Sequence, residues 1–350
     1  MTSLLHVIDY GTSLGFTGPL HPQSCHNLKS AIEAPIAVTS SIQSLLANSR
    51  AHGPFLSSPF PNFRTSPLGT VTRKRQTKRC LINHLSWPQG DSVNDGIPNS
   101  KAHIHYDSFE NAIRLLRSFG CGSLLAKLDL KDAFHHIPVR HQDWPLLGFH
   151  WQSAFYYSVV LVFGVKTAPY IFNLFAEALH WIIQQHLPGD LRHYLDDFLF
   201  AFRPTTTLAA SNAAIDWCHS LCKQLGLSTQ EQKTICPCTC LEFLGLELDS
   251  IAMEACLPSD KLLFLRQTLD DWATRPATTL RELQELIGFL QFASQVIPHS
   301  RAFIRRLIDF STTFRSPFAI WHIPAYARAD INWWYTFAAA WNGVRELVSW

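Results

Sequence analysis

The stretch His193–Phe200 reads HYLDDFLF and places the adjacent carboxylates of Asp196 and Asp197 between β-prone, largely apolar flanks. This pattern predicts a tight hairpin with the two acids at its tip. Burying one carboxylate is costly, and crowding two raises the cost further unless a cation neutralises them. Mg²⁺ prefers carboxylate oxygens and keeps coordination positions open for substrate phosphates. A solvated Asp-Asp turn is the alternative, but Asp129, which ends an apolar run upstream, favours a metal site.

Length and composition allow a large core and more than one subdomain, since the chain has 350 residues, of which 47% are hydrophobic and 16% charged. Nine cysteines, an odd number, without a secretory signal indicate a reducing, intracellular compartment, cytoplasmic or nuclear. The run 154–165 is too short and too interrupted to cross a bilayer, so no membrane partner is expected. Cys236-Pro237-Cys238-Thr239-Cys240 lacks a matching Cys or His pair nearby, so no zinc site is expected.

A basic segment lies between residues 61 and 90. The whole chain, by contrast, has a net charge of only +2. It predicts a strand over Leu68–Thr72, a turn over residues 73–77 and a return strand over Lys78–Leu85. A hairpin with a cationic tip suits phosphate binding, and a solvated basic loop is the alternative. The segment has no acid, and its cations are Arg64, Arg73, Lys74, Arg75, Lys78 and Arg79.

Apolar periodicity predicts the remaining elements of the first two thirds of the chain. Thr167 is expected to cap a helix that begins at Ala168 with Pro169 in its first turn. The order of strand, helix, strand hairpin, helix and strand predicts an α+β palm with helices on one side of a mainly antiparallel sheet. The expected helices are Ser40–Asn48, Ser108–Phe119, 168–187 and Leu208–Leu225, and the expected strands are Leu124–Leu130, Trp151–Leu161 and Leu241–Leu248.

Helices are expected after Pro258, over Ser259–Ala273 and after Thr279, which has capping-box spacing to Glu282. A third helical piece, Arg301–Phe310, has three arginines against a single acid. These arginines suit a surface that follows a nucleic-acid backbone, and plain solvation of the helix is the alternative reading.

Four motifs in order carry a family resemblance. The sequence resembles a reverse transcriptase, and it is most similar to retroelement enzymes of the LTR and tyrosine-recombinase (DIRS-like) kinds. The resemblance runs from about Pro54 to Phe310. Each motif alone is weak, whereas four in order at workable spacing are strong. The motifs are Leu128–Phe134 (LDLKDAF), Phe163–Pro169 (FGVKTAP), Tyr194–Asp197 (YLDD) and Phe243–Leu246 (FLGL).

The resemblance implies a right-hand polymerase fold, α+β in class, with fingers, a palm with an antiparallel sheet, and a helical thumb. It implies RNA-directed DNA polymerase activity with dNTPs on an RNA or DNA template with primer, within a longer polyprotein that includes ribonuclease H. The domains expected are an N-terminal lead-in over 1–53, fingers and palm over 54–256, a thumb over 257–315, and a connection with the start of a ribonuclease H-like region over 316–350.

The resemblance also implies the metal ligands. Asp129 and Asp196 would hold two Mg²⁺ ions, with Mn²⁺ as a substitute, while Asp197 has a lesser role and the Leu130 carbonyl is a further ligand. One ion would activate the primer 3′-hydroxyl and the other would bind the triphosphate. Lys233 stands where the family has a proton donor to pyrophosphate, and a plain surface lysine is the alternative.

The remaining roles concern nucleotide and primer. Phe134 would exclude a 2′-hydroxyl, although a core aromatic is the alternative. The backbone N–H groups of Asp132 and Ala133 would meet the triphosphate, with Gly164 also near the nucleotide. The other residues implied are Arg79 and Lys74 at the phosphates and Leu244 and Gly245 at the primer end.

Two departures from the family pattern support a competing hypothesis. Lys78 stands before the phosphate arginine where an aromatic residue is usual, and Cys80 follows it. Phe163-Gly164 lacks the proline that many relatives have before this pair. A catalytically impaired retroelement remnant that only binds nucleic acid is therefore the alternative function.

Overall fold

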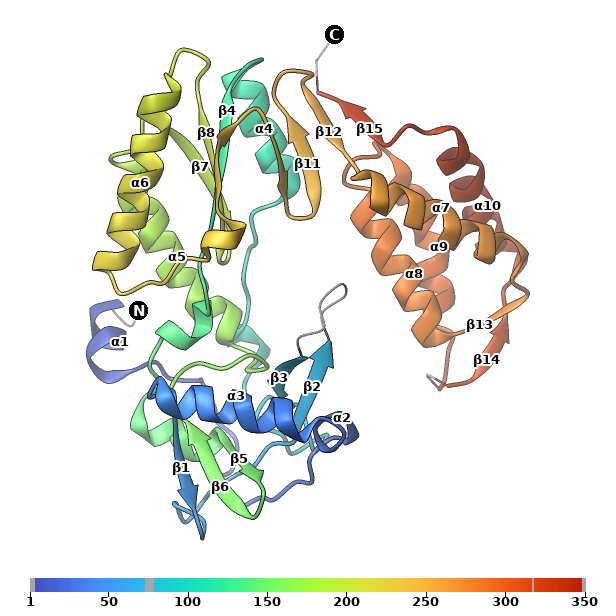
Figure 1. Ribbon diagram of the computed structural model, residues 1–350. Coiled ribbons are helices and arrows are strands. Elements are labelled where there is room, and N and C mark those ends of the chain that lie inside the picture. Colours follow the sequence, from blue (N-terminus) through green and yellow to red (C-terminus); the bar gives the residue numbers. More distant parts are fainter. Residues whose placement is uncertain (1–3, 73–78, 317, 348–350) are drawn as a thin grey trace. The chain divides into compact units, whose positions relative to one another are not determined.

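A computed structural model describes residues 4–72, 79–316 and 318–347, and the chain divides into two compact units (Figure 1). The division passes through the strand β4, of which Asp129 is the last residue. The predicted α+β class is confirmed. Unit 1 comprises residues 1–106, 129–185 and 219–230, and unit 2 comprises 107–128, 186–218 and 231–350.

Unit 1 is built around an antiparallel sheet in the order β1-β6-β5, with the helix α3 (Pro35–Ala47) packed against β1 (Ala51–Phe55) (Figure 1). The helix begins before the expected Ser40, because Pro35 occupies its first turn. Small and branched side chains of α3, including Val38 and Ile42, meet Phe149 and Trp151 of the sheet in one buried cluster.

The strand expected over Trp151–Leu161 is observed only in part, as β6 (Ala154–Ser158), because its first residues form the end of β5 (Gly148–Trp151) and the turn of a β5–β6 hairpin. Gln152 and Ser153 form its turn with φ values of 47° and 65°. Neither residue is a common choice for positive φ, so the sequence lacks the usual turn signal. The hairpin β2 (Leu68–Thr72) and β3 (Arg79–Asn83) matches the prediction, while the turn predicted at residues 73–77 lies outside the described residues.

Arg64 does not belong to a cationic surface, since its side chain is 1% exposed. Its guanidinium donates to Gln23 Oε1 at 2.7 Å and lies 3.2 Å from Asp91 Oδ1, and His21 Nε2 lies 3.0 Å from the same carboxylate. Burying a charge is tolerated where partners satisfy it. This network holds together three distant segments of unit 1.

The predicted side-chain cap at Thr167 is also wrong. The helix α5 (Ala168–Gln184) follows Thr167, but the Thr167 hydroxyl donates to the Leu14 carbonyl at 2.9 Å and makes no capping bond. Leu14 is fully buried, and its own N–H donates to Asp143 Oδ2 at 2.7 Å. The N-terminal residues are therefore tied into unit 1 at the start of α5.

Unit 2 contains a four-stranded sheet in the order β7-β8-β4-β9. β8 (Asp197–Phe202) forms a hairpin with β7 (Gly189–Tyr194), and its residues 198–202 are fully buried. β4 (Leu124–Asp129) is the next strand. The helix expected over Ser108–Phe119 is observed as α4 (Phe109–Phe119), which Ser108 caps and which packs against β8. The helix predicted over Leu208–Leu225 is observed as α6 (Leu208–Gln224), of which residues 208–218 belong to unit 2 and the rest to unit 1.

A second sheet of unit 2 has the order β10-β11-β12-β15. The strand expected over Leu241–Leu248 is instead a hairpin of β10 (Cys240–Phe243) and β11 (Leu246–Asp249). Leu244 and Gly245 form its turn with φ values of 50° and 82°. Leucine rarely adopts positive φ, and the apolar run continues through Leu244. The sequence pattern therefore predicts one continuous strand instead of a turn.

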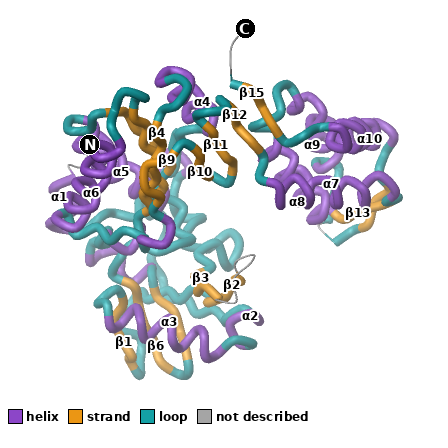
Figure 2. Tube along the Cα trace, turned by 45° about the horizontal axis from the view of Figure 1, so that its top comes forward, coloured by secondary structure: helices purple, strands orange, loops and turns teal. Residues whose placement is uncertain are grey.

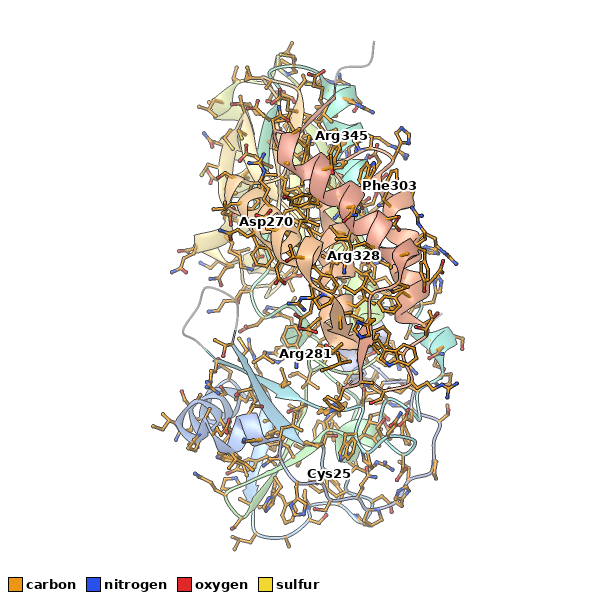
Figure 3. The ribbon with its side chains drawn as sticks, turned by 90° about the vertical axis from the view of Figure 1, so that its right-hand side faces the viewer. Cys25, Asp270, Arg281, Phe303, Arg328 and Arg345 are labelled. Carbon is orange, nitrogen blue, oxygen red and sulfur yellow. The ribbon has the colours of Figure 1, made fainter. Side chains whose placement is uncertain are left out.

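Four helices pack together in the rest of unit 2, and the short strand β13 lies at one end of them (Figure 2). It pairs with β14 in a two-stranded sheet. Arg328 of α10 donates to the carbonyls of Trp272, Ala273 and Arg275, which end α7 (Figure 3). Arg345 of β15 pairs with Glu110 of α4 at 2.8 Å. The helices are α7 (Ser259–Thr274), α8 (Leu280–Ala293), α9 (Arg305–Ser311) and α10 (Ala325–Ala340).

The expected helix Arg301–Phe310 is broken at Phe303, and the predicted role of its arginines along a nucleic-acid backbone stays a prediction. Arg306 pairs with the fully buried Asp330 at 2.6 Å, so it is a structural residue. Arg305 pairs with Asp309 in the exposed i,i+4 manner, which contributes little stability.

Shorter elements complete the described chain. They are α1 (Leu4–Tyr10), α2 (Lys29–Ile32), β1 (Ala51–Phe55), η1 (Asn99–Lys101), η2 (Ala133–His136), η3 (His141–Leu146), η4 (Glu231–Lys233), β9 (Ile235–Cys238), β12 (Glu254–Cys256), β13 (Ala277–Thr279), η5 (Ser300–Ile304), β14 (Ile320–His322) and β15 (Val344–Glu346).

Among the described helices, none has both the length and the apolar character needed to span a bilayer.

The predicted capping box of α8 is confirmed and yields a pH prediction. Bonds from the Thr279 N–H and hydroxyl, with Arg275 nearby, lower the pKa of Glu282 to about 2. Because the pKa in the folded state is depressed from 4.5, the stabilisation is present above about pH 4.5 and is lost as pH falls toward 2. We expect Thr279→Ala to lower the free energy of unfolding by about 1 kcal/mol at pH 7.

Denaturant titrations followed by tryptophan fluorescence would measure this loss, because Trp272 and Trp334 are buried in unit 2. The stability difference between the wild type and Glu282→Gln should shrink between pH 5 and about pH 2. Glu285→Gln, on the exposed face of the same helix, is the control. A difference for Glu282→Gln that does not change with pH would contradict the assignment.

Candidate active site

The two carboxylates of the opening stretch lie where they were predicted, at the tip of the β7–β8 hairpin. Tyr194 and Asp197 are the last paired residues, and Leu195 turns the chain with a φ of 55°. The apolar residues of β8 are fully buried, so the strand cannot shift its register without exposing them. The buried strand therefore fixes the acids at the tip.

Crowding and burial shape the electrostatics of this tip. Burial, together with the charge of Asp197, raises the pKa of Asp196. Lys127 of the adjacent strand β4 places its ammonium 3.0 Å from Asp197 Oδ1. The Asp197 Oδ1 atom is itself buried, so this ion pair is shielded from water. A lysine thus balances part of the negative charge of the two carboxylates.

Lys233 ends the short helix η4 in the same unit, and its side chain is exposed. Its positive charge acts to lower the pKa of Asp196, against the larger effect of burial. The structure therefore brings Lys233 into the electrostatic reach of the carboxylate pair, although its predicted role as proton donor stays a prediction.

Asp129 and Leu130 belong to unit 1 and are both buried, with Asp129 only 3% exposed. The Asp129 carbonyl accepts from the Gln230 N–H at 2.8 Å, and Leu130 bridges to Thr229. Because Asp196 and Asp197 belong to unit 2, the gathering of the three carboxylates around metal stays a prediction.

A left-handed residue begins the predicted nucleotide-binding turn. Asp132 has φ 52° and ψ 37°, and it precedes Ala133 and Phe134 in η2. Arg50 donates to Asp132 Oδ2 at 2.8 Å and lies 3.3 Å from His135 Nδ1. Burial acts to raise the pKa of Asp132, but Arg50, together with smaller contributions from His135 and Lys131, outweighs it and the pKa is lowered. Burial and Arg50 lower the pKa of His135 to about 4, so a neutral imidazole can accept from Arg50.

Phe134 is 9% exposed and is held between two other rings of unit 1. Its centroid lies 4.7 Å from that of Phe163 and 5.6 Å from that of Phe172, both in edge-to-face geometry. Such pairs stabilise a ring by about 0.5–1.5 kcal/mol beyond its buried area. The ring is therefore rigidly placed, as both the sugar-contact prediction and the core alternative require.

Gly164 precedes α5 with a φ of 102°, and a Cβ there would lie 2.5 Å from the Asn83 carbonyl oxygen. Asn94 holds this turn with both ends of its amide. Its Nδ2 donates to the Gly164 carbonyl at 2.7 Å, and its Oδ1 accepts from the Lys166 N–H at 2.8 Å. The turn thus needs a glycine and has a fixed geometry.

The hairpin of β2 and β3 places Arg79 and Cys80 on opposite faces, since Arg79 pairs with Thr72 and Cys80 with Val71. Arg79 is exposed, and its Nη1 lies 3.3 Å from Thr70 Oγ1 on the same face. Lys74, the other predicted phosphate contact, lies outside the described residues.

The predicted primer-contacting residues Leu244 and Gly245 share the turn between β10 and β11. Sequence reasoning missed four side chains that contact predicted site residues. Each contacts a residue that is distant in the sequence, so no local pattern relates the two. The four are Arg50, Asn94, Lys127 and Lys261.

The carboxylate pair offers only oxygen ligands, which Mg²⁺ prefers. The raised pKa of Asp196 and the burial of Asp197 Oδ1 mean that a cation would stabilise the ionised pair. Within the described part of the chain, no group of three or more His, Cys, Asp or Glu side chains could hold a metal ion. Asp196 and Asp197 therefore fit such an ion by their chemistry, as a pair.

Comparison with known proteins gives one family and two kinds of relatives. The sequence profile described as Reverse transcriptase (RNA-dependent DNA polymerase) matches residues 73–248, about half of the chain. The Genome polyprotein of Petunia vein clearing virus (isolate Shepherd) is 26% identical over 199 residues, or 57% of this chain and 8% of that protein. Protein P of Duck hepatitis B virus (strain United States/DHBV-16) is 26% identical over 252 residues, or 71% and 28% respectively. The chain spans less than a third of either relative.

Solved structures share the fold. A foamy viral protease-reverse transcriptase in complex with RNA/DNA hybrid matches with a TM-score of 0.67 and 16% identity, covering 95% of this chain and 40% of that chain. A related foamy viral structure with double-stranded DNA gives 0.67 and 16%, covering 95% and 53%. This likeness confirms the predicted polymerase fold.

The opposite faces of Arg79 and Cys80 give a prediction about phosphate contact. If the Arg79 face meets the triphosphate, Arg79→Ala should lower kcat/KM for nucleotide incorporation roughly 30- to 1,000-fold, because a bidentate charged contact is lost. Cys80→Arg should leave kcat/KM nearly unchanged. Single-nucleotide incorporation measures both. An unimpaired Arg79→Ala together with a large gain from Cys80→Arg would mean that the other face meets the nucleotide.

Proposed function

The chain belongs to the reverse transcriptase (RNA-dependent DNA polymerase) family, and from this premise we propose that it extends a primer 3′-hydroxyl with dNTPs on an RNA or DNA template. The observation that carries the proposal is the Asp196–Asp197 pair at the hairpin tip, with the raised pKa of Asp196 and the buried Oδ1 atom of Asp197. A mere surface turn would leave both carboxylates solvated.

Asp129, Asp196 and Asp197 are proposed to hold two divalent cations, Mg²⁺ or Mn²⁺, with the Leu130 carbonyl. When bound, such ions supply charge stabilisation of the transferring phosphoryl group and lower the pKa of the attacking hydroxyl. Lys233 is proposed to donate a proton to the departing pyrophosphate. Its charge already acts on Asp196 in the described structure.

Other residues are proposed to bind and orient the nucleotide and primer. The amides of Asp132 and Ala133, held by Arg50, would meet the triphosphate together with Arg79 and Lys74. Phe134 would lie against the sugar, with Gly164 near the nucleotide. Leu244 and Gly245 would contact the primer end.

We further propose a retroelement origin and a role within a longer polyprotein that includes ribonuclease H, with a lead-in over 1–53, fingers and palm over 54–256, a thumb over 257–315 and a connection beyond. The competing function is nucleic-acid binding without catalysis. Cys80 beside Arg79 favours it, and primer extension on RNA and DNA templates decides between the two.

Asp196→Asn tests the metal site. Because metal charge is worth several kcal/mol in such transfers, extension should fall by about 1,000-fold or more. Binding of primer–template should change little, since phosphate contacts supply most of its affinity. Extension assays and a filter-binding titration measure the two quantities.

Asp190→Asn is the matched control, because Asp190 lies on β7 of the same hairpin, at its opposite end from the tip. Near wild-type extension by Asp196→Asn would exclude the proposed metal role, whereas equal losses in both variants would point to damage of the hairpin.

Phe134→Val tests sugar choice. Removing the ring should open room for a 2′-hydroxyl, so the preference for dNTP over NTP in kcat/KM should fall by roughly 10- to 200-fold. Phe134→Tyr retains the ring and should keep the preference. Phe172→Val removes a ring that packs on Phe134 and controls for loosened packing. An unchanged preference in Phe134→Val would make Phe134 a core residue only.

A further inference from the structure

Lys261, in the first turn of α7, reaches three other parts of unit 2. Its ammonium donates to the Gly245 carbonyl at 2.6 Å and lies 2.6 Å from Glu242 Oε1 on β10. The same nitrogen lies 5.7 Å from the ring centroid of Phe292 on α8, within the range of a cation–π contact. One side chain thus connects a strand, a hairpin turn and a helix.

The position of Lys261 along its helix argues that these contacts determine its conformation. A cation in the first turn of a helix opposes the helix dipole, which favours acidic residues there. An ammonium has three donors, and two of them are directed at Glu242 and Gly245. The side chain is only 24% exposed, so it is not a freely solvated lysine.

The turn that Lys261 contacts has little freedom to move. Leu244 and Gly245 have φ values of 50° and 82°, and a two-residue turn of this kind sets the register of its strands. A Cβ added at Gly245 would lie 3.2 Å from Phe292 Cε2 and 3.3 Å from Lys261 Nζ. The turn is therefore packed closely against the lysine and the ring together.

We propose that Lys261 is a positioning residue for the primer 3′ end: it holds the Leu244–Gly245 turn against Phe292 of α8. This inference rests on the proposed function, in which that turn contacts the primer. Phosphoryl transfer depends on the position of the attacking hydroxyl, and a displacement of 1 Å can cost about 100-fold in rate. Lys261 therefore acts on the reaction through the turn, without touching the reacting atoms.

The test compares Lys261→Met and Lys261→Arg in the full chain by rapid-quench single-nucleotide addition. Methionine keeps the unbranched shape and loses the charge and donors, so the addition rate should fall roughly 10- to 100-fold. The apparent Kd for dNTP should stay within about twofold, because the nucleotide contacts lie elsewhere. Arginine keeps the charge and donors and should recover most of the rate. Lys223→Met, at an exposed lysine of α6, is the matched control.

The burst amplitude separates positioning from folding. A merely structural lysine would lower the fraction of active enzyme and leave the burst rate unchanged, which would overturn the proposal. So would a wild-type rate in Lys261→Met, or equal losses in the methionine and arginine variants.

A second measurement needs no catalysis. A primer with 2-aminopurine at its 3′ end reports the surroundings of that base when the primer–template binds. The terminal fluorescence should differ between wild type and Lys261→Met at saturation, and should be restored in Lys261→Arg. Identical spectra would overturn the positioning role. Absence of extension by the wild type would instead count against the proposed function, so the two failures are distinguishable.

Discussion

Two carboxylates forced together at the tip of one hairpin are the constraint on which the rest of the predicted site depends. The buried residues of β8 hold Asp196 and Asp197 in register. The free energy gained by burying these apolar residues offsets the repulsion between the two carboxylates at the tip. Lys127 offsets part of the charge, yet the Asp196 pKa remains raised. Such a tip is less stable without a cation than with one, which is the property that a site for divalent ions requires.

The sequence predicts elements well where periodicity and local chemistry agree. The strand Leu68–Thr72, the helix that follows Ser108 and the capping box at Thr279 are all observed as predicted. Prediction fails at turns whose residues are poor turn formers. Gln152-Ser153 and Leu244-Gly245 turn the chain with positive φ inside sequences that continue to resemble strands. Tertiary pairing of the flanking strands outweighs the local preference there.

Candidate site residues could be found by residue type and motif, but not the side chains that hold them. Asp132 and its partner Arg50 are 82 positions apart, and Lys166 and Asn94 are 72 apart. No local pattern relates residues at such separations. Arg64 shows the converse error, since a cation in a basic segment proves to be buried within a network. Charge along the sequence therefore does not identify which cations reach the surface.

The predicted functional turns share one physical feature. Asp132, Gly164, Leu195 and Gly245 all have positive φ, a conformation that costs energy for residues other than glycine. Three of these turns are each held by a side chain from elsewhere in the same unit: Arg50 at Asp132, Asn94 at Gly164 and Lys261 at Gly245. The fourth, at Leu195, is held by the buried strand that follows it. In a regular strand the amides and carbonyls point at the neighbouring strands. In these turns, polar contacts from distant residues fix an irregular backbone, so its amides and carbonyls can point in other directions. The side chains that fix these turns are therefore as much a part of the proposed site as the residues that would touch substrate.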